Sequence, residues 1–250
     1  MSEQKKPLWY YMQKVRGGKH LEPLNSGNHA VAVGMPLAIA LNYAEAKFMV
    51  QNEVYKDFKR VDPYWIEGVG RQHFGHNSIH GEGCVAEWGY KVVADVGVIP
   101  CTGKPNVDWL KKAPLVTEVL ALPVAKAKVS KITTVEQLQK AVLEEEKPVV
   151  VFTSGPGFDL KKVDEEGYAV PSGQWNIGLT CLGGVEEKTD GLFFACHWGD
   201  VFSPPQHGEP LGGFWVRYKQ INQMLRSDNE AYVIDEFEGF PSGDCGHCCV

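Results

Sequence analysis

The spacing of apolar residues changes near the middle of the chain, and this change most constrains the fold. From Val33 to Phe58, apolar residues recur at helical spacing between Glu, Lys and Gln residues, which predicts one amphipathic helix of about seven turns. A second helix is predicted from Cys84 to Val96, where Gly97 supplies the stop, and a short third helix at residues 107–112. The first part of the chain is therefore predicted to be helical.

After Pro114, short β-rich runs replace the helical pattern, at residues 127–132, 149–153, 175–185, 192–197, 214–218 and 232–237. One helix interrupts them from Thr134 to Glu146, with Thr133 and Glu136 as the predicted capping box. Helices followed by strands predict an α+β fold, in which an N-terminal helical lobe packs on a C-terminal, mostly antiparallel β-sheet lobe. A cleft is expected where the two lobes meet.

Composition excludes several classes of function. Of 250 residues, 44% are hydrophobic, and 31 acidic against 25 basic side chains give a net charge of −6, as in an ordinary globular protein. The basic residues are scattered, so we expect no nucleic-acid partner. No apolar run approaches the roughly 20 residues of a membrane helix, and the apolar stretch at residues 8–12 is too short for a signal peptide. We therefore expect no membrane partner and synthesis in the cytoplasm.

One candidate nucleophile is Cys84, which follows a Gly-Glu-Gly turn at a predicted helix start. The helix dipole there would lower the pKa of the thiol, and His197 or one of three nearby histidines would serve as its base: His73, His76 and His80. The alternative is that Cys84 is simply a small buried residue, which is common for free cysteines and which we favour.

The same three histidines, with or without Cys84, have spacings typical of zinc ligands. However, three glycines interrupt the helix that would place them on one face: Gly75, Gly81 and Gly83. No acidic residue completes a hydrolytic zinc motif. We therefore expect neither a metal site nor a cofactor.

Several short motifs together resemble one known family. They are GEGCVAEWGYK at 81–91, VGVIP at 96–100, PSGQWNI at 171–177, ACHWG at 195–199, GGFWV at 212–216 and FEGFP at 237–241. In this order they resemble the papain-like proteins, the C1-type cysteine peptidases, and specifically a branch encoded by tailed bacteriophages and some environmental bacteria. The resemblance implies a papain-like domain over 21–241, helical over about 30–113 and β-rich over about 114–241. An N-terminal arm, 1–20, and a Cys-rich tail, 242–250, flank it.

The resemblance also locates the family's catalytic positions, and each is changed here. The nucleophilic Cys falls on Ala32, the general-base His on Ile177 and the orienting Asn on Cys196, and the position of the polar oxyanion-hole residue resembles Asn25. Papain-type chemistry needs a thiolate, an imidazole and a group that holds the imidazole. The resemblance with these changes implies a degenerate member that is not an enzyme. It also implies that three tryptophans belong to the core: Trp88, Trp175 and Trp198.

The resemblance further implies a non-catalytic structural protein of a tailed-phage virion, made in the host bacterial cytoplasm, with other virion proteins as partners. Whether it forms a homo-oligomer stays open. The alternative is an active thiol hydrolase that uses Cys84 or Cys196 with His197 on a peptide or cell-wall substrate.

Three of the seven cysteines, Cys245, Cys248 and Cys249, lie within the last six residues. Thiols on a chain terminus are suited to bridging subunits once a particle leaves the reducing cell. We therefore predict that at least one of them forms a disulfide with a neighbouring virion subunit.

Overall fold

The computed structural model describes residues 5–27, 31–54, 56–75, 83–101, 103–112, 124–200, 204–226 and 229–240. The α-helices are α1 Leu8–Val15, α2 Gly34–Gln51, α3 Pro63–Val69, α4 Ala86–Lys91, α6 Val135–Gln139 and α7 Tyr218–Met224. Three of them continue as π-helical turns, α3 as η1 Gly70–Phe74, α4 as η2 Val92–Val96 and α6 as η4 Lys140–Glu144, and a 3₁₀ turn, η3, spans Val107–Leu110. The strands are β1 Lys128–Ile132, β2 Val149–Thr153, β3 Phe158–Val163, β4 Ala169–Pro171, β5 Ile177–Gly183, β6 Gly191–Ala195, β7 Gly213–Arg217 and β8 Glu230–Glu236.

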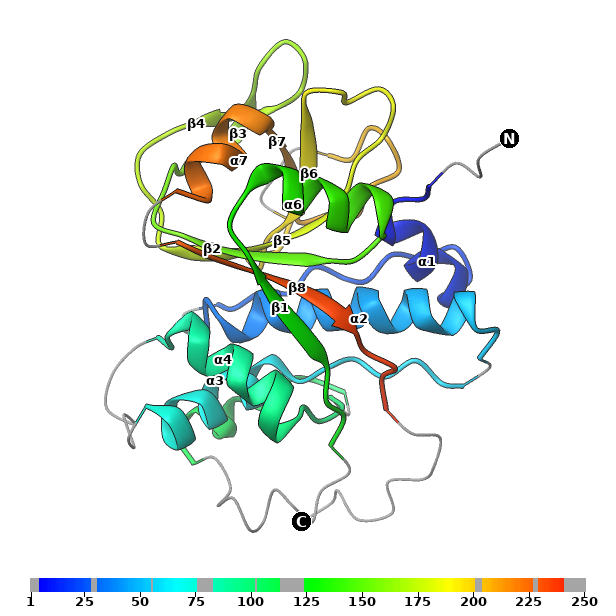
Figure 1. The fold of residues 1–250 in the computed structure, drawn as a ribbon, viewed down its shortest axis with the longest axis vertical. Coiled ribbons are helices and arrows are strands. Elements are labelled where there is room, and N and C mark those ends of the chain that lie inside the picture. The colour runs from blue at the N-terminus through cyan, green and yellow to red at the C-terminus, as the bar shows by residue number, and fades with distance from the viewer. Residues whose placement is uncertain are drawn as a thin grey trace.

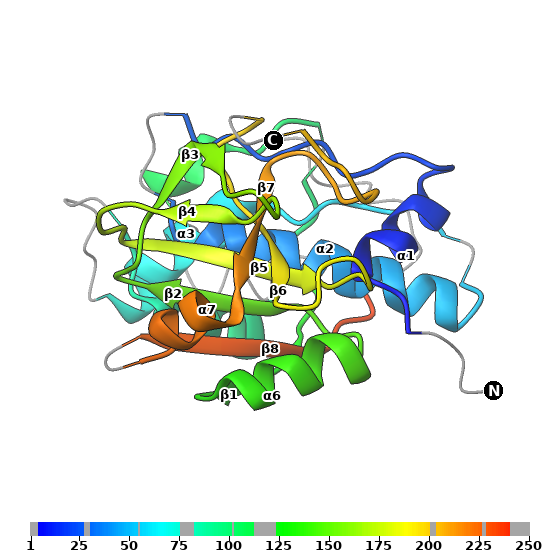
Figure 2. The same cartoon turned by 90° about the horizontal axis from the view of Figure 1, so that it is seen from above.

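Six strands form one sheet in the order β1-β8-β2-β5-β6-β7, in which every neighbouring pair is antiparallel. The short β3 and β4 pair separately. Helix α2 lies across one face of the sheet with α3 and α4 beyond it, whereas α6 and α7 lie on the other side (Figures 1 and 2). The predicted α+β architecture, with helices first and an antiparallel sheet afterwards, is confirmed.

Helix α2 is buried on almost every side, because it lies between the sheet and α3. The predicted amphipathic helix over 33–58 is therefore wrong in length and character: α2 ends at Gln51, and its polar residues Asn42 and Glu45 are fully buried. Asn42 is only half satisfied there: its Oδ1 accepts a hydrogen bond from the amide of Val61 at 2.9 Å, whereas its Nδ2 has no hydrogen-bond partner among the described residues. A single buried helix thus forms the centre of the molecule.

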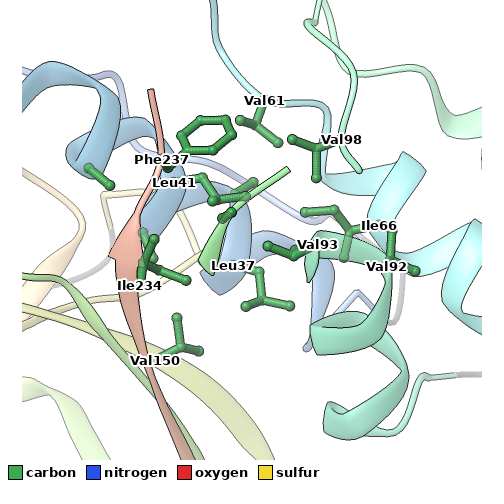
Figure 3. Close-up of a cluster of buried hydrophobic side chains, with 14 of the residues drawn as sticks. Leu37, Leu41, Val61, Ile66, Val92, Val93, Val98, Val150, Ile234 and Phe237 are labelled. Atoms are coloured by element: carbon green, nitrogen blue, oxygen red, sulfur yellow. The ribbon is translucent and has the colours of Figure 1, made fainter. Parts of the chain in front are cut away.

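The apolar core has three clusters of buried side chains. The first lies between α2, the helices beyond it and the sheet, and includes Leu37, Ile66 and Val150 (Figure 3). The second fills the opposite face of the sheet under α6 and α7. The third joins α1 to α2 and to strands β5 to β7. The sheet therefore has a covered apolar face on both sides.

Helix α1 is part of this body, although the sequence pattern predicted no element there. Its Trp9 is 3% exposed and meets the rings of Phe193 and Trp215 edge-on, with centroids 5.5 and 6.3 Å apart. The chain just before α1 is held by Glu146, whose Oε1 accepts a hydrogen bond from the Lys6 amide at 2.8 Å. Residues 5–15 thus pack into the third cluster.

The capping box of α6 lies one residue later than predicted. The Thr134 side chain accepts a hydrogen bond from the Gln137 amide at 3.2 Å, and the Gln137 side chain accepts one from the Thr134 amide at 3.3 Å. The predicted pair, Thr133 and Glu136, is therefore wrong, because the helix begins at Val135.

The three tryptophans predicted for the core, Trp88, Trp175 and Trp198, are each partly exposed. The fully buried tryptophan is Trp65, which is 0% exposed.

Among the residues that the structure describes, no helix is both long and apolar enough to cross a bilayer.

Candidate functional site at the junction of helix and sheet

The start of β5 packs directly on the first turn of α2. A Cβ added to Gly178 would lie 2.5 Å from the carbonyl oxygen of Ala32 and 2.5 Å from Cγ of Pro36, so only glycine fits. The Thr180 hydroxyl also donates a hydrogen bond to the Pro36 carbonyl oxygen at 2.8 Å. These contacts fix the N-terminus of the central helix against the sheet, with Ala32 partly exposed beside it.

Two of the predicted triad positions lie at adjacent ends of neighbouring strands. Ile177 begins β5, and Cys196 follows the end of β6, where Thr180 pairs with Ala195. Both side chains are almost fully buried, at 3% and 2% exposed, and both belong to the second core cluster. The assignment of Ala32, Ile177 and Cys196 to the family's triad stays a prediction.

Four residues close to the start of β5 and the end of β6 have exposed or partly exposed side chains. Asn25 forms an isolated antiparallel bridge with Trp198. The ring centroids of Trp198 and Trp175 are 4.7 Å apart, and Asn176, which follows Trp175 in the chain, is exposed. We call these four residues, together with Ala32, the junction surface. Two backbone hydrogen bonds hold its edges together: Ser26 N–H to the carbonyl of His197, 3.1 Å, and Gly199 N–H to the carbonyl of Leu24, 3.1 Å.

Cys196 and His197 are electrostatically neutral at neutral pH. Burial raises the pKa of the Cys196 thiol to about 12 and lowers the pKa of the His197 imidazole to about 4. The His197 ring is 3% exposed, and its Nδ1 has no hydrogen-bond partner among the described residues. This pair therefore lacks the thiolate and imidazolium that an activated cysteine nucleophile needs.

The Cys84 thiol, which was predicted as a nucleophile, is also protonated at neutral pH. It precedes α4 and lies against Gly70, and burial, with the charge of Glu67 adding to it, raises the pKa of its thiol. The prediction that a helix dipole lowers this pKa is wrong, because the desolvation of a buried thiolate is the larger effect. The structure does not show the predicted pair of Cys84 and His197 in contact. The His197 ring contacts the ring of Trp198, whereas Cys84 packs against the first core cluster.

Sequence reasoning missed the residue that caps α2. No side chain of α2's own N-terminal segment caps the helix, and Oε2 of Glu67 on α3 accepts the hydrogen bond of the Gly34 amide at 2.8 Å. The Glu67 side chain is fully buried, and desolvation raises its pKa to about 7. An acidic group at the positive end of the helix dipole is favourable. A cap from 33 residues away leaves no local sequence signal.

The structure places His73 in η1, whereas His76 and His80 lie outside the described residues, as do Cys245, Cys248 and Cys249. Within the described ranges, no three His, Cys, Asp or Glu side chains are grouped to hold a metal ion. The four described cysteines, Cys84, Cys101, Cys181 and Cys196, are free thiols.

Comparisons with solved structures show the same fold. The cysteine protease xylellain from Xylella fastidiosa matches with a TM-score of 0.57 and 15% identity, over 86% of this chain and 83% of that one. A cysteine protease from Carica candamarcensis, solved with E-64, matches with a TM-score of 0.51 and 13% identity, over 88% and 96%. Digestive procathepsin L 3 of Tenebrio molitor larval midgut matches with a TM-score of 0.53 and 12% identity, over 85% and 66%.

No family model matches the sequence, and a search of curated proteins finds no match either. The chain thus has the papain-like cysteine protease fold, as the motifs implied. The comparisons also correct one expectation. Each of the solved structures named above is a cysteine protease, which contradicts the prediction that this chain is not an enzyme, and we withdraw that prediction.

Proposed function

We propose that this protein acts on polypeptides and that the junction surface binds an extended polypeptide segment. One observation carries the proposal: Trp175, just before β5, and Trp198, just after β6, are partly exposed with their ring centroids 4.7 Å apart. Partly exposed tryptophans offer large apolar area and a polar N–H group, and such residues dominate many polypeptide-binding surfaces. Xylellain and the Carica candamarcensis protein, both named as cysteine proteases, support a polypeptide as the bound molecule.

We further propose that the bound polypeptide belongs to another subunit of a tailed-phage particle, in which this protein is assembled after its synthesis in the host cytoplasm. The support is the resemblance of the motifs at 81–91, 171–177 and 212–216 to the phage branch of the papain-like proteins. A contact between subunits also suits a surface that is held rigidly by β5 and by the Asn25 bridge.

Site-specific cross-linking tests both statements. A photoreactive amino acid in place of Asn176, an exposed position on the junction surface, should form an adduct with a polypeptide of the particle. The same amino acid in place of Asn52 is the matched control, because Asn52 is also exposed but follows the opposite end of α2, about 27 Å away. Equal adducts at both positions, or an adduct at Asn52 alone, would contradict the proposal.

A synthetic peptide of the cross-linked segment then measures affinity. Asn176→Arg should weaken its binding by at least about tenfold, because a long charged side chain blocks the surface, and Asn52→Arg should leave binding unchanged. Mass spectrometry of the same mixtures shows whether the peptide is cut and between which residues.

The C-terminal cysteines carry a separate proposal, that at least one of Cys245, Cys248 and Cys249 forms a disulfide with a neighbouring subunit. Three thiols within residues 245–249 favour an intermolecular bond in an oxidising medium. Intact particles run without reductant should show the protein in a higher-mass band that collapses when a thiol is added. Migration only as a 27.7 kDa monomer would be evidence against the bond.

A further inference from the structure

Residues 237–240, which follow β8 and which we call the strap, pass over the central helix. Figure 1 shows the chain leaving β8 beside α2. Phe237 and Phe240 are each 3% exposed and pack into the first core cluster, where Phe237 lies near Leu41 and Val61 (Figure 3). Two buried aromatic rings therefore anchor a segment that has no strand pairing of its own.

Beneath the strap lies the carboxyl group of Glu45, which is fully buried. Gly239 crosses directly above it with φ of +71°, and a Cβ at that position would overlap the Glu45 carboxylate. The backbone of Gly239 thus closes the way between this carboxyl group and water. Neither oxygen of Glu45 has a hydrogen bond of good geometry within the described residues.

One cation ties the strap to this carboxyl group. Nζ of Lys56 donates hydrogen bonds to the carbonyl oxygens of Glu238 and Phe240, both at 2.7 Å, and lies 3.5 Å from Oε1 of Glu45. The Lys56 side chain is itself 10% exposed, so the ion pair is poorly screened by solvent. The buried carboxylate is therefore only partly compensated, by one ammonium group that two carbonyl groups share.

We propose that residues 237–240 form a pH-dependent strap, which stays closed over Glu45 in mild acid and opens more readily as the pH rises. The physical reason is that opening gives water access to a carboxyl group that ionises with difficulty while it is covered. A cavity of about 720 Å³, lined in part by Lys56, Gly239 and Phe240, borders the strap and leaves room for this movement.

The direction follows from proton linkage. In the closed form, burial raises the pKa of Glu45 to about 7, against the opposing effects of Lys56, the Phe240 amide and Lys59. In the open form the pKa returns towards its ordinary value of 4.5. The open form therefore binds fewer protons between these values, so opening becomes more favourable as the pH rises through them. Among the described residues, the other charged side chains that line the cavity beside the strap are Lys126, Lys128, Glu236 and Glu238.

Hydrogen exchange of the strap amides, corrected for the intrinsic pH dependence of exchange, tests the proposal. Between pH 5 and pH 8 the opening constant should rise by about 70-fold in the unmodified protein. In Glu45→Gln this rise should vanish, because no proton is lost on opening. Glu67→Gln is the matched control, since Glu67 is an equally buried carboxyl group with a pKa of about 7 away from the strap, and there the rise should persist.

Two results would overturn the proposal: a strap whose corrected exchange does not change with pH, and a rise in Glu45→Gln as large as in the unmodified protein. A measurement on the unmodified chain decides the matter if Glu45→Gln does not fold. The carboxyl carbon signal of Glu45 should titrate with a midpoint near pH 7. A midpoint near 4.5 would show that the strap does not isolate this group and would exclude the mechanism.

Discussion

Trp65→Ala should lower the free energy of unfolding by about 3–5 kcal/mol, which is among the largest effects of any single truncation in this chain. Trp65 is 0% exposed, its ring meets that of Trp109 edge-on at 5.2 Å, and its Nε1 donates a hydrogen bond to the Gly97 carbonyl at 2.9 Å. Truncation leaves a large cavity between α2, α3 and η2 and an unpaired carbonyl group. Urea denaturation followed by circular dichroism measures the loss.

Trp65→Phe keeps an aromatic ring in the core, and it removes the hydrogen-bond donor together with part of the indole. We expect it to cost about 1–2 kcal/mol. Trp198→Ala serves as the comparison, since that ring is partly exposed and its removal should cost less than the removal of Trp65. Equal losses for Trp65→Ala and Trp198→Ala would contradict the burial described for α3.

Trp9→Ala should also destabilise the protein by about 3–5 kcal/mol. Trp9 is 3% exposed and contacts the rings of Phe193 and Trp215, so its truncation opens the third core cluster and breaks the packing of α1 on the sheet. A shift of the urea midpoint with an unchanged slope would show a loss of stability in a fold that otherwise stays the same.

Lys14→Ala is the control within the same helix, because Lys14 is exposed on the outer side of α1. We expect its effect to lie within about 0.5 kcal/mol of zero. If Trp9→Ala were as mild as Lys14→Ala, residues 5–15 would be a loosely attached arm, and the packing of α1 described above would be wrong.

The elements that sequence reasoning located are those with an unbroken local pattern. The run Val149–Thr153 is apolar throughout and is β2, which is buried along its whole length. The β-rich runs predicted at 214–218 and 232–237 likewise agree with β7 and β8 to within two residues. Such segments are recognisable because burial on both faces selects β-branched and aromatic residues at every position.

Short helices escaped prediction because their stability is not local. Helix α3 has seven residues and α7 has seven, too few for a clear period of 3.6. The Asp62 cap of α3, whose Oδ1 accepts a hydrogen bond from the Tyr64 amide at 2.9 Å, stands before a proline at the first helical position. That signal was present in the sequence and was overlooked.

By itself, the sequence determined the order of helices before strands, the position of the central helix but not its length or burial, six of the eight strands and, through its motifs, the papain-like fold. It also fixed which residue types stand at Ala32, Ile177 and Cys196. Only the tertiary structure decided the protonation of Cys84, Cys196 and His197, because a pKa depends on burial, which no local pattern encodes. Glu67 caps α2 from a position 33 residues along the chain, and the strap covers Glu45 from a position almost 200 residues away. Such contacts exist only once the chain has folded.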